Sequence, residues 1–134
     1  MDLEVIKIAE NTTNYKHIKN HSHKYKHKNT ICGDEIEITL KIKDRKIIDF
    51  GYQTKSCIYC QASASLLSRI SKNKKIYEVN KFLKIANDLF RDEHESTPKY
   101  WKSFNSIFKK DNFQRKDCLL LPLNALKKII NRYD

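Results

Sequence analysis

The sequence predicts an α+β fold in which a small antiparallel sheet packs against about four helices. Residues 35–43 alternate apolar and polar side chains, and a second apolar-rich run follows after a short polar turn, which is the pattern of a β-hairpin. From residue 59 onward the apolar residues recur at helical spacing instead. A hairpin alone is only marginally stable, so we expect the helices to cover its apolar face.

The hairpin is the best-defined element of the chain. In the run EIEITLKIK, the even-numbered side chains from Ile36 to Ile42 are all apolar, and the residues between them are polar or charged. Side chains two residues apart lie on the same face of a strand, so we expect this apolar face to be buried. Residues 43–46 are predicted to form the turn, and residues 46–53 the second strand.

The remaining elements are expected to be helices and one N-terminal arm. The predicted helices span residues 3–10, residues 59–71, residues 76–91, a segment that begins at Pro98, and residues 121–133, with a charged loop over residues 109–117. Residues 11–29 are polar and have no sustained period, which indicates an extended arm with at most one edge strand. We expect a single domain over residues 1–134, with residues 1–28 as a partly mobile arm.

The chain is strongly basic, with a formal net charge of +11 at pH 7. We nevertheless expect no nucleic-acid partner, because 22 of the 27 basic residues are lysines scattered along the chain. Specific contacts to bases and phosphates favour the planar fork of arginine. No apolar run approaches the ~20 residues of a membrane span, and the N-terminal residues lack a secretory pattern. We therefore expect a cytoplasmic protein without a membrane partner, whose cysteines are not structural disulfides.

Three of the four cysteines lie where predicted elements meet. Cys32 comes just before the first strand, Cys57 lies between the hairpin and a helix, and Cys118 lies between the charged loop and the last helix. Asp34 follows Cys32 by two residues, so both side chains are expected to point to one side of an extended segment. Three thiolates and one carboxylate match a tetrahedral zinc site or the ligand set of an iron–sulfur cluster.

The stretch CIYC, which carries Cys57 and Cys60, has three interpretations. It is a redox pair, half of a zinc site, or one functional cysteine beside a second that has no role. Both cysteines lie near the start of a predicted helix, where the helix dipole stabilises a thiolate. Lys55 beside Cys57, and Arg115 and Lys116 before Cys118, add positive charge. These surroundings favour reactive or metal-binding thiolates at Cys32, Cys57 and Cys118, whereas Cys60 alone is expected to be a small buried side chain.

Two longer stretches contain these residues: CGDEIEITLKIKDRKIIDFGYQTKSCIYCQASASLLSRI and RKDCLLLPLNAL. Together they resemble the core motifs of the IscU, NifU and SufU scaffolds of iron–sulfur cluster assembly, over roughly residues 29–132. The long separation between Cys57 and Cys118 resembles the SufU branch. The resemblance implies that Cys32, Asp34, Cys57 and Cys118 hold a metal or a cluster. It places Cys60 at a position usually held by a small residue such as serine.

The chain also departs from the family pattern. Ser56 stands where the family commonly has glycine, and Asp117 replaces the histidine of IscU or the lysine of SufU. Arg115 matches an arginine that precedes the last cysteine in SufU. The leucine-proline-proline motif of IscU is absent before Cys118, so we expect no partnership with the dedicated Hsp70 system.

The resemblance implies a non-enzymatic scaffold that accepts sulfur from a cysteine desulfurase, builds a labile [2Fe–2S] cluster and passes it to apo-proteins. Cys32 and Cys118 are the candidate persulfide acceptors. The SufU resemblance leaves a second function open, a sulfurtransferase in which Zn²⁺ holds the thiols until a desulfurase displaces one of them. A third function is a thiol-redox protein that uses Cys57 and Cys60.

Overall fold

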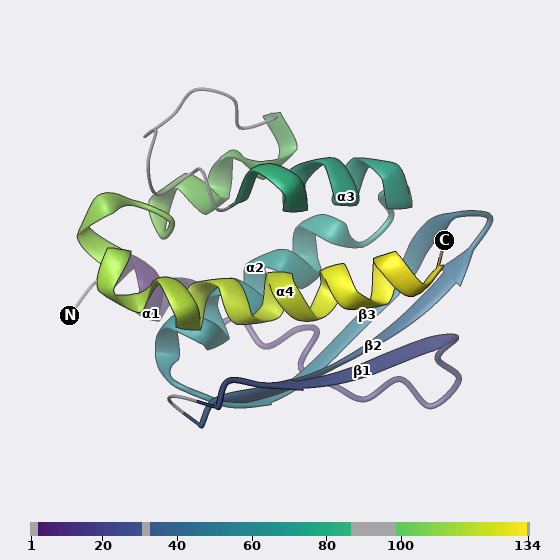
Figure 1. The fold of residues 1–134 in the computed structure, drawn as a ribbon, viewed down its shortest axis with the longest axis horizontal. Helices are drawn as coiled ribbons and strands as arrows, with labels where there is room; N and C mark the ends of the chain where they lie inside the picture. Colours follow the sequence, from purple (N-terminus) through teal and green to yellow (C-terminus); the bar gives the residue numbers. More distant parts are fainter. Residues whose placement is uncertain (1–2, 31–32, 87–98, 134) are drawn as a thin grey trace.

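The computed structural model describes residues 3–30, 33–86 and 99–133. The elements in chain order are α1 (Leu3–Ala9), β1 (His23–Lys28), β2 (Glu35–Lys43), β3 (Lys46–Lys55), α2 (Ile58–Ser71), α3 (Ile76–Ile85), the 3₁₀ helices η2 (Lys99–Ser106) and η3 (Lys110–Arg115), and α4 (Lys116–Tyr133). Figure 1 shows the sheet at one side of the molecule, with α2 and α4 between it and α3. This arrangement confirms the predicted α+β fold.

The sheet has three antiparallel strands in the order β1-β2-β3. The predicted hairpin is confirmed as β2 and β3, although β3 continues to Lys55. Asp44 and Arg45 join the two strands with φ angles of 53° and 61°, the positive values that a two-residue hairpin turn requires. The possible edge strand of the N-terminal arm is β1, which pairs with β2 from His23 to Lys28.

Both faces of β2 are covered in part. Ile36, Ile38 and Leu40 are at most 1% exposed, as their alternation predicts, whereas Ile42 is only half-buried beyond a register shift after Lys41. Thr39 lies on the predicted polar face, yet it is also only 1% exposed. The coil before β1 covers it, since the backbone N–H of Ile18 donates a hydrogen bond to Thr39 Oγ1 at 3.1 Å.

The central helix is α2, which contacts α1, α4 and β3. Most of it is buried, and its alanines and serines leave room for neighbours on several sides. The buried serines have partners: Ser65 donates to the carbonyl of Asn11 at 2.6 Å, and Ser68 accepts from the side-chain amide of Asn14 at 3.1 Å. These bonds hold the coil after α1 against α2.

The C-terminal third differs from the sequence-based prediction in its helix boundaries. The segment after Pro98 forms the 3₁₀ helix η2 instead of an α-helix. Trp101 and Phe104 are nevertheless buried, as expected. The centroids of their rings lie 4.2 and 4.9 Å, respectively, from that of Phe82. Pro98 itself and the predicted end of the helix over 76–91 lie outside the described residues. The charged loop predicted over 109–117 is wrong, because η3 and the start of α4 occupy this segment.

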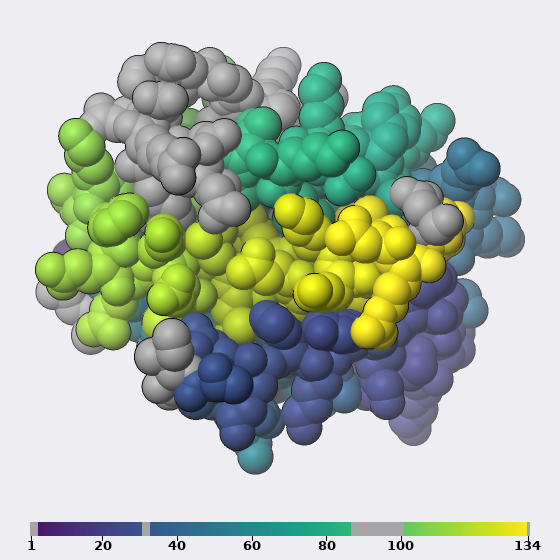
Figure 2. All heavy atoms as spheres, in the orientation of Figure 1, coloured from purple at the N-terminus to yellow at the C-terminus, as the bar shows by residue number. Residues whose placement is uncertain are grey.

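Helix α4 begins at Lys116, five residues before the predicted start, so Pro122 lies inside it. A proline there removes one helical hydrogen bond, which is why the sequence pattern favoured a start beside it. The bond lost is the one to the carbonyl of Cys118, four residues before the proline. The hydroxyl of Ser63 on α2 donates to the neighbouring carbonyl of Leu119 at 2.6 Å, which anchors the first turn of α4. Figure 2 shows α4 on the surface between α3 and β1. Among the described residues, no helix has both the length and the hydropathy needed to cross a bilayer.

Candidate metal centre

Three of the predicted ligands meet at one end of the sheet. Asp34 directly precedes β2, Cys57 follows β3 as the N-cap of α2, and Cys118 lies in the first turn of α4. One donor atom from each of them, a carboxylate oxygen and two sulfurs, lies within 4.8 Å of the other two. Asp34 and Cys57 are half-buried, and Cys118 is 9% exposed.

The hairpin register brings Asp34 and Cys57 together. Glu35 pairs with Lys55 in the last rung of the β2–β3 ladder, so the residues just beyond this rung lie side by side. The side chain of Cys57 caps no backbone group of α2, which leaves its sulfur available. The backbone N–H of Cys57 instead approaches Asp34 Oδ2 at 3.5 Å.

Cys118 reaches this point because α4 packs against α2. The hydrogen bond from Ser63 to the carbonyl of Leu119 ties the first turn of α4 to the second turn of α2. Sequence reasoning missed this contribution of Ser63, and the run of small residues after Cys57 is the signal that could have found it. Cys118 therefore lies inside a helix and not at the junction that the sequence predicted.

The electrostatics around Cys118 favour a cation. Burial raises the pKa of the Cys118 thiol, and the neighbouring Cys57 and Asp34 raise it further. Arg115 and Lys116, which were expected to stabilise a Cys118 thiolate, lie over the rings of Tyr59 and Phe113, respectively, and the pKa of Cys118 is raised and not lowered. Three groups that become anionic in one small volume repel each other, and a bound cation removes that repulsion.

The donor set fits a metal. A tetrahedral zinc–thiolate site has a donor–donor separation of roughly 3.8 Å for bonds of about 2.3 Å. The three donor atoms lie within 4.8 Å of one another, so a small closing movement would bring them to this spacing. Thiolates are soft ligands that suit zinc and iron–sulfur clusters, and the carboxylate oxygen is a harder ligand.

Cys32, the fourth predicted ligand, lies outside the described residues, so its role remains a prediction. The next residue, Gly33, has a φ of 81° and donates its N–H to the carbonyl of Asn29 at 2.8 Å. A positive φ suits glycine, because a Cβ at this angle would be strained.

Cys60 is separate from the three-residue group. Its side chain is fully buried, and its sulfur lies 3.9 Å from Thr54 Oγ1. The expectation that Cys60 is a small buried side chain is confirmed. Burial raises its pKa to about 12, so the helix start does not stabilise a thiolate there. The dipole effect is worth about 1 kcal/mol at a helix end, and it is smaller than the cost of burying a charge.

Known proteins resemble this chain both in sequence and in fold. The chain is 30% identical over 105 residues to the iron–sulfur cluster assembly scaffold protein IscU 1 of Archaeoglobus fulgidus, a match that covers 78% of this chain. The chain spans only 58% of the length of that relative.

Two solved structures share the fold. A NifU-like protein (N-terminal) from Brucella abortus superposes with a TM-score of 0.86 at 18% identity, covering 96% of this chain and 90% of that one. A candidate iron–sulfur cluster assembly scaffold for the SUF system from Fervidobacterium islandicum AW-1 gives a TM-score of 0.84 at 22% identity, covering 95% of this chain and 93% of that one. These likenesses concern the fold.

The family described as the NifU-like N terminal domain matches residues 2–103. This range includes Asp34 and Cys57, and Cys118 follows it. The match covers most of the chain, and the fold agrees with that of the Brucella protein. The chain therefore belongs to the family of NifU-like N-terminal domains.

Proposed function

We propose that this protein is an iron–sulfur cluster assembly scaffold, which receives sulfur from a cysteine desulfurase, builds a labile [2Fe–2S] cluster and transfers it to apo-proteins. The observation that carries the proposal is the grouping of Asp34, Cys57 and Cys118 where β2, α2 and α4 begin. The scaffold name borne by the Archaeoglobus relative supports the same function.

In this proposal Cys32, Cys57 and Cys118 bind the cluster through sulfur and Asp34 binds it through oxygen. A cluster that must leave needs a weak ligand, and a carboxylate is harder than a thiolate and less well matched to iron in a sulfide cage. Asp34 would then be the ligand at which release begins. The cluster is cargo, so its lability is part of the function.

Sulfur transfer requires one thiolate that the donor can reach. The thiolate attacks the outer sulfur of the desulfurase persulfide, a new S–S bond forms, and the S–S bond of the donor breaks to leave the desulfurase thiolate. Cys32 and Cys118 are the candidate acceptors. The low exposure of Cys118 favours Cys32 as the first acceptor.

A zinc-dependent sulfurtransferase is the second candidate function. The same donors suit Zn²⁺, and the likeness in fold to the SUF-system candidate supports considering it. Bound zinc would keep the thiols deprotonated and ordered until a desulfurase displaces one of them. The third function, a Cys57–Cys60 redox pair, has less support, because the buried Cys60 thiol with its raised pKa is a poor attacking group.

Metal and sulfide analysis of protein purified without oxygen tests the proposal. A scaffold should bind iron and inorganic sulfide in equal amounts, absorb visible light, and lose that absorbance when an apo iron–sulfur protein is added. Colourless protein that retains about one zinc through reconstitution would support the sulfurtransferase instead. Metal-free protein with a disulfide between Cys57 and Cys60 would contradict both functions.

A further inference from the structure

Thr54 is the next-to-last residue of β3, and its hydroxyl touches both strands of the hairpin. Thr54 Oγ1 donates to the carbonyl of Glu35 at 2.6 Å and lies 2.8 Å from Ser56 Oγ. A hydroxyl has one hydrogen to donate, so Ser56 is the donor in the second bond. Glu35 follows Asp34, and Ser56 precedes Cys57. One hydroxyl therefore joins the neighbours of two proposed ligands.

This bond lies at the last rungs of the sheet, next to the point where the ladder ends. The β2–β3 ladder ends with the pair of Glu35 and Lys55, so Asp34 and Cys57 are both beyond its last rung. Asp34 is held from the β1 side, since the N–H of Asn29 donates to its carbonyl at 2.8 Å. On the other side, the carbonyl of Ser56 accepts a bond from Gln61 Nε2 at 2.9 Å. The Thr54 hydroxyl adds a side-chain contact between these two sides, beside the Glu35–Lys55 rung and the approach of the Cys57 N–H to Asp34 Oδ2.

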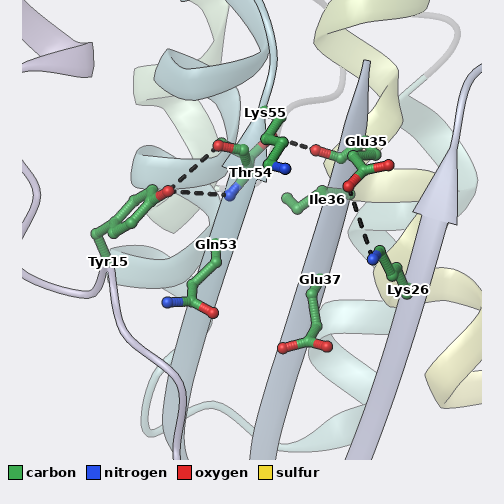
Figure 3. A pocket seen from close by; sticks show the side chains of 8 residues that line it. All are labelled: Tyr15, Lys26, Glu35, Ile36, Glu37, Gln53, Thr54 and Lys55. Carbon is green, nitrogen blue, oxygen red and sulfur yellow. Dashed lines mark hydrogen bonds and ion pairs between the residues drawn. The ribbon is translucent and has the colours of Figure 1, made fainter. Parts of the chain in front are cut away.

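Tyr15 braces Thr54 from the outer edge of β3, where the coil before β1 pairs with Tyr52. Its hydroxyl donates to the carbonyl of Thr54 at 3.2 Å and lies 3.4 Å from the N–H of the same residue. The ring of Tyr15 packs edge-to-face on Tyr52 with centroids 5.3 Å apart. Figure 3 shows Tyr15 beside Thr54 at the rim of an open hollow of about 290 Å³. The backbone of Thr54 is thus held while its side chain reaches towards β2.

We propose that Thr54 is a positioning residue of the metal centre, whose hydroxyl sets the spacing between Asp34 and Cys57. This inference rests on the proposed metal-binding function of that centre. Groups that orient ligands from outside the ligand set commonly change metal affinity by 10–100-fold when they are removed. Loss of the Thr54 hydroxyl would let the two chain segments move apart, so metal would bind more weakly and leave faster.

The test compares three variants of the full chain by titration with Co²⁺, whose absorption bands report thiolate binding and geometry. Thr54→Val removes the hydroxyl and keeps the shape, whereas Thr54→Ser keeps the hydroxyl. Thr39→Val is the matched control. Thr39 lies on β2, five residues after Asp34, and its hydroxyl also forms a hydrogen bond with a backbone group, the N–H of Ile18. We expect about tenfold weaker Co²⁺ binding and altered bands for Thr54→Val alone.

Three outcomes would overturn the inference: unchanged Co²⁺ affinity in Thr54→Val, an equal loss in Thr54→Ser, or an equal loss in Thr39→Val. If the wild-type protein binds no Co²⁺, the proposed function itself fails. Amide hydrogen exchange of the metal-free protein still tests the positioning. The Cys57 N–H should exchange about tenfold faster in Thr54→Val than in wild type or Thr54→Ser, and equal rates in all three would refute the role of the hydroxyl.

Discussion

Cys57 and Cys60 are three residues apart in the sequence but have different surroundings. Cys57 is half-buried, and its sulfur belongs to the group with Asp34 and Cys118. Cys60 lies one turn later on α2, where the helix faces the core, and it is fully buried. A free cysteine in such a position acts as a small apolar side chain. The two thiols therefore differ in what they can bind.

We predict that Cys57→Ser abolishes metal binding and that Cys60→Ser leaves the metal stoichiometry unchanged. The second variant places a hydroxyl in the core, so its free energy of unfolding should fall by about 1–3 kcal/mol. Metal analysis of both purified variants, together with denaturant unfolding, measures the two effects separately. A loss of metal in Cys60→Ser as large as that in Cys57→Ser would refute the assignment.

Asp34 lies close to both thiols and directly follows Gly33. We predict that Asp34→Ala retains more iron–sulfur cluster and transfers it more slowly to an apo-acceptor, because the weakest ligand is gone. Zn²⁺ affinity should instead fall at least about tenfold, since zinc loses one of its ligands.

Absorbance of the bound cluster over time, with an acceptor present, checks the Asp34 prediction. Asp117→Ala is the matched control, because Asp117 is an exposed carboxylate next to Cys118 that does not belong to the three-residue group. Equal cluster retention and equal transfer rates in wild type and Asp34→Ala would show that Asp34 does not tune release.

At the scale of elements, the coil between α1 and β1 is built into the sheet. The N–H of Lys16 donates to the carbonyl of Tyr52 at 3.0 Å, and Tyr52 donates back to the carbonyl of Asn14 at 3.1 Å. Gly51 makes this contact possible, because a Cβ there would lie 2.6 Å from the carbonyl oxygen of Lys16. The coil carries Tyr15, so its attachment also affects the segment around Thr54.

We predict that Gly51→Ala destabilises the protein by about 3 kcal/mol, at the upper end of the cost of overpacking. The added methyl meets backbone, which cannot rotate away, so the coil must move off β3. Denaturant unfolding measures the loss, and faster amide exchange at Lys16 and Ile18 locates it. Gly33→Ala is the control: apart from its chain neighbours, no atom of the described residues lies within 4 Å of a Cβ added there, so the expected cost is that of the positive φ, about 1–2 kcal/mol. An equal loss in both variants would contradict this account.

At the scale of the whole molecule, Asp49 on β3 joins three parts of the chain. Its Oδ1 lies 3.1 Å from Lys16 Nζ in the coil and 3.4 Å from Lys72 Nζ after α2. Burial alone would raise the pKa of Asp49, but hydrogen bonds from Lys16 and the Phe50 N–H, with the charges of Lys16 and Lys72, lower it below 3.8 on balance. The folded state therefore favours the ionised carboxylate.

A lowered pKa stabilises the fold above the pKa of the unfolded chain, and this contribution is lost as the pH falls through the folded-state value. We predict that Asp49→Asn lowers the free energy of unfolding by about 1 kcal/mol at pH 7, a modest loss because Asp49 and its two lysine partners are partly exposed. The difference from wild type should disappear well below pH 3.8. Denaturant unfolding over this pH range measures it. Asp44→Asn, in the exposed hairpin turn, is the charge-matched control, and an equal pH-dependent loss there would assign the effect to net charge.

Much of the fold follows from local pattern. The alternation from Ile36 to Leu40 predicted the strand and its apolar buried face, because residues two apart in a strand point to the same side. The burial of Thr39 on the other face was not predicted, since the coil before β1 covers it. Helical spacing likewise identified α2 and the core role of Trp101 and Phe104. Local pattern failed at Pro122, where it predicted a helix start, since it could not include the packing of the first turns of α4 against α2.

The candidate site was likewise predictable only in part from the sequence. The sequence by itself determined which residue types are available as ligands, and the motifs around Cys57 and Cys118 indicated the family. Only the tertiary structure brought Cys118 to Asp34 and Cys57, because that contact depends on how α4 packs against α2. The burial of Cys60, which distinguishes it from the half-buried Cys57, also depends on residues that are far apart along the chain and meet when it folds. The same is true of the hydrogen bond from Thr54 to the carbonyl of Glu35.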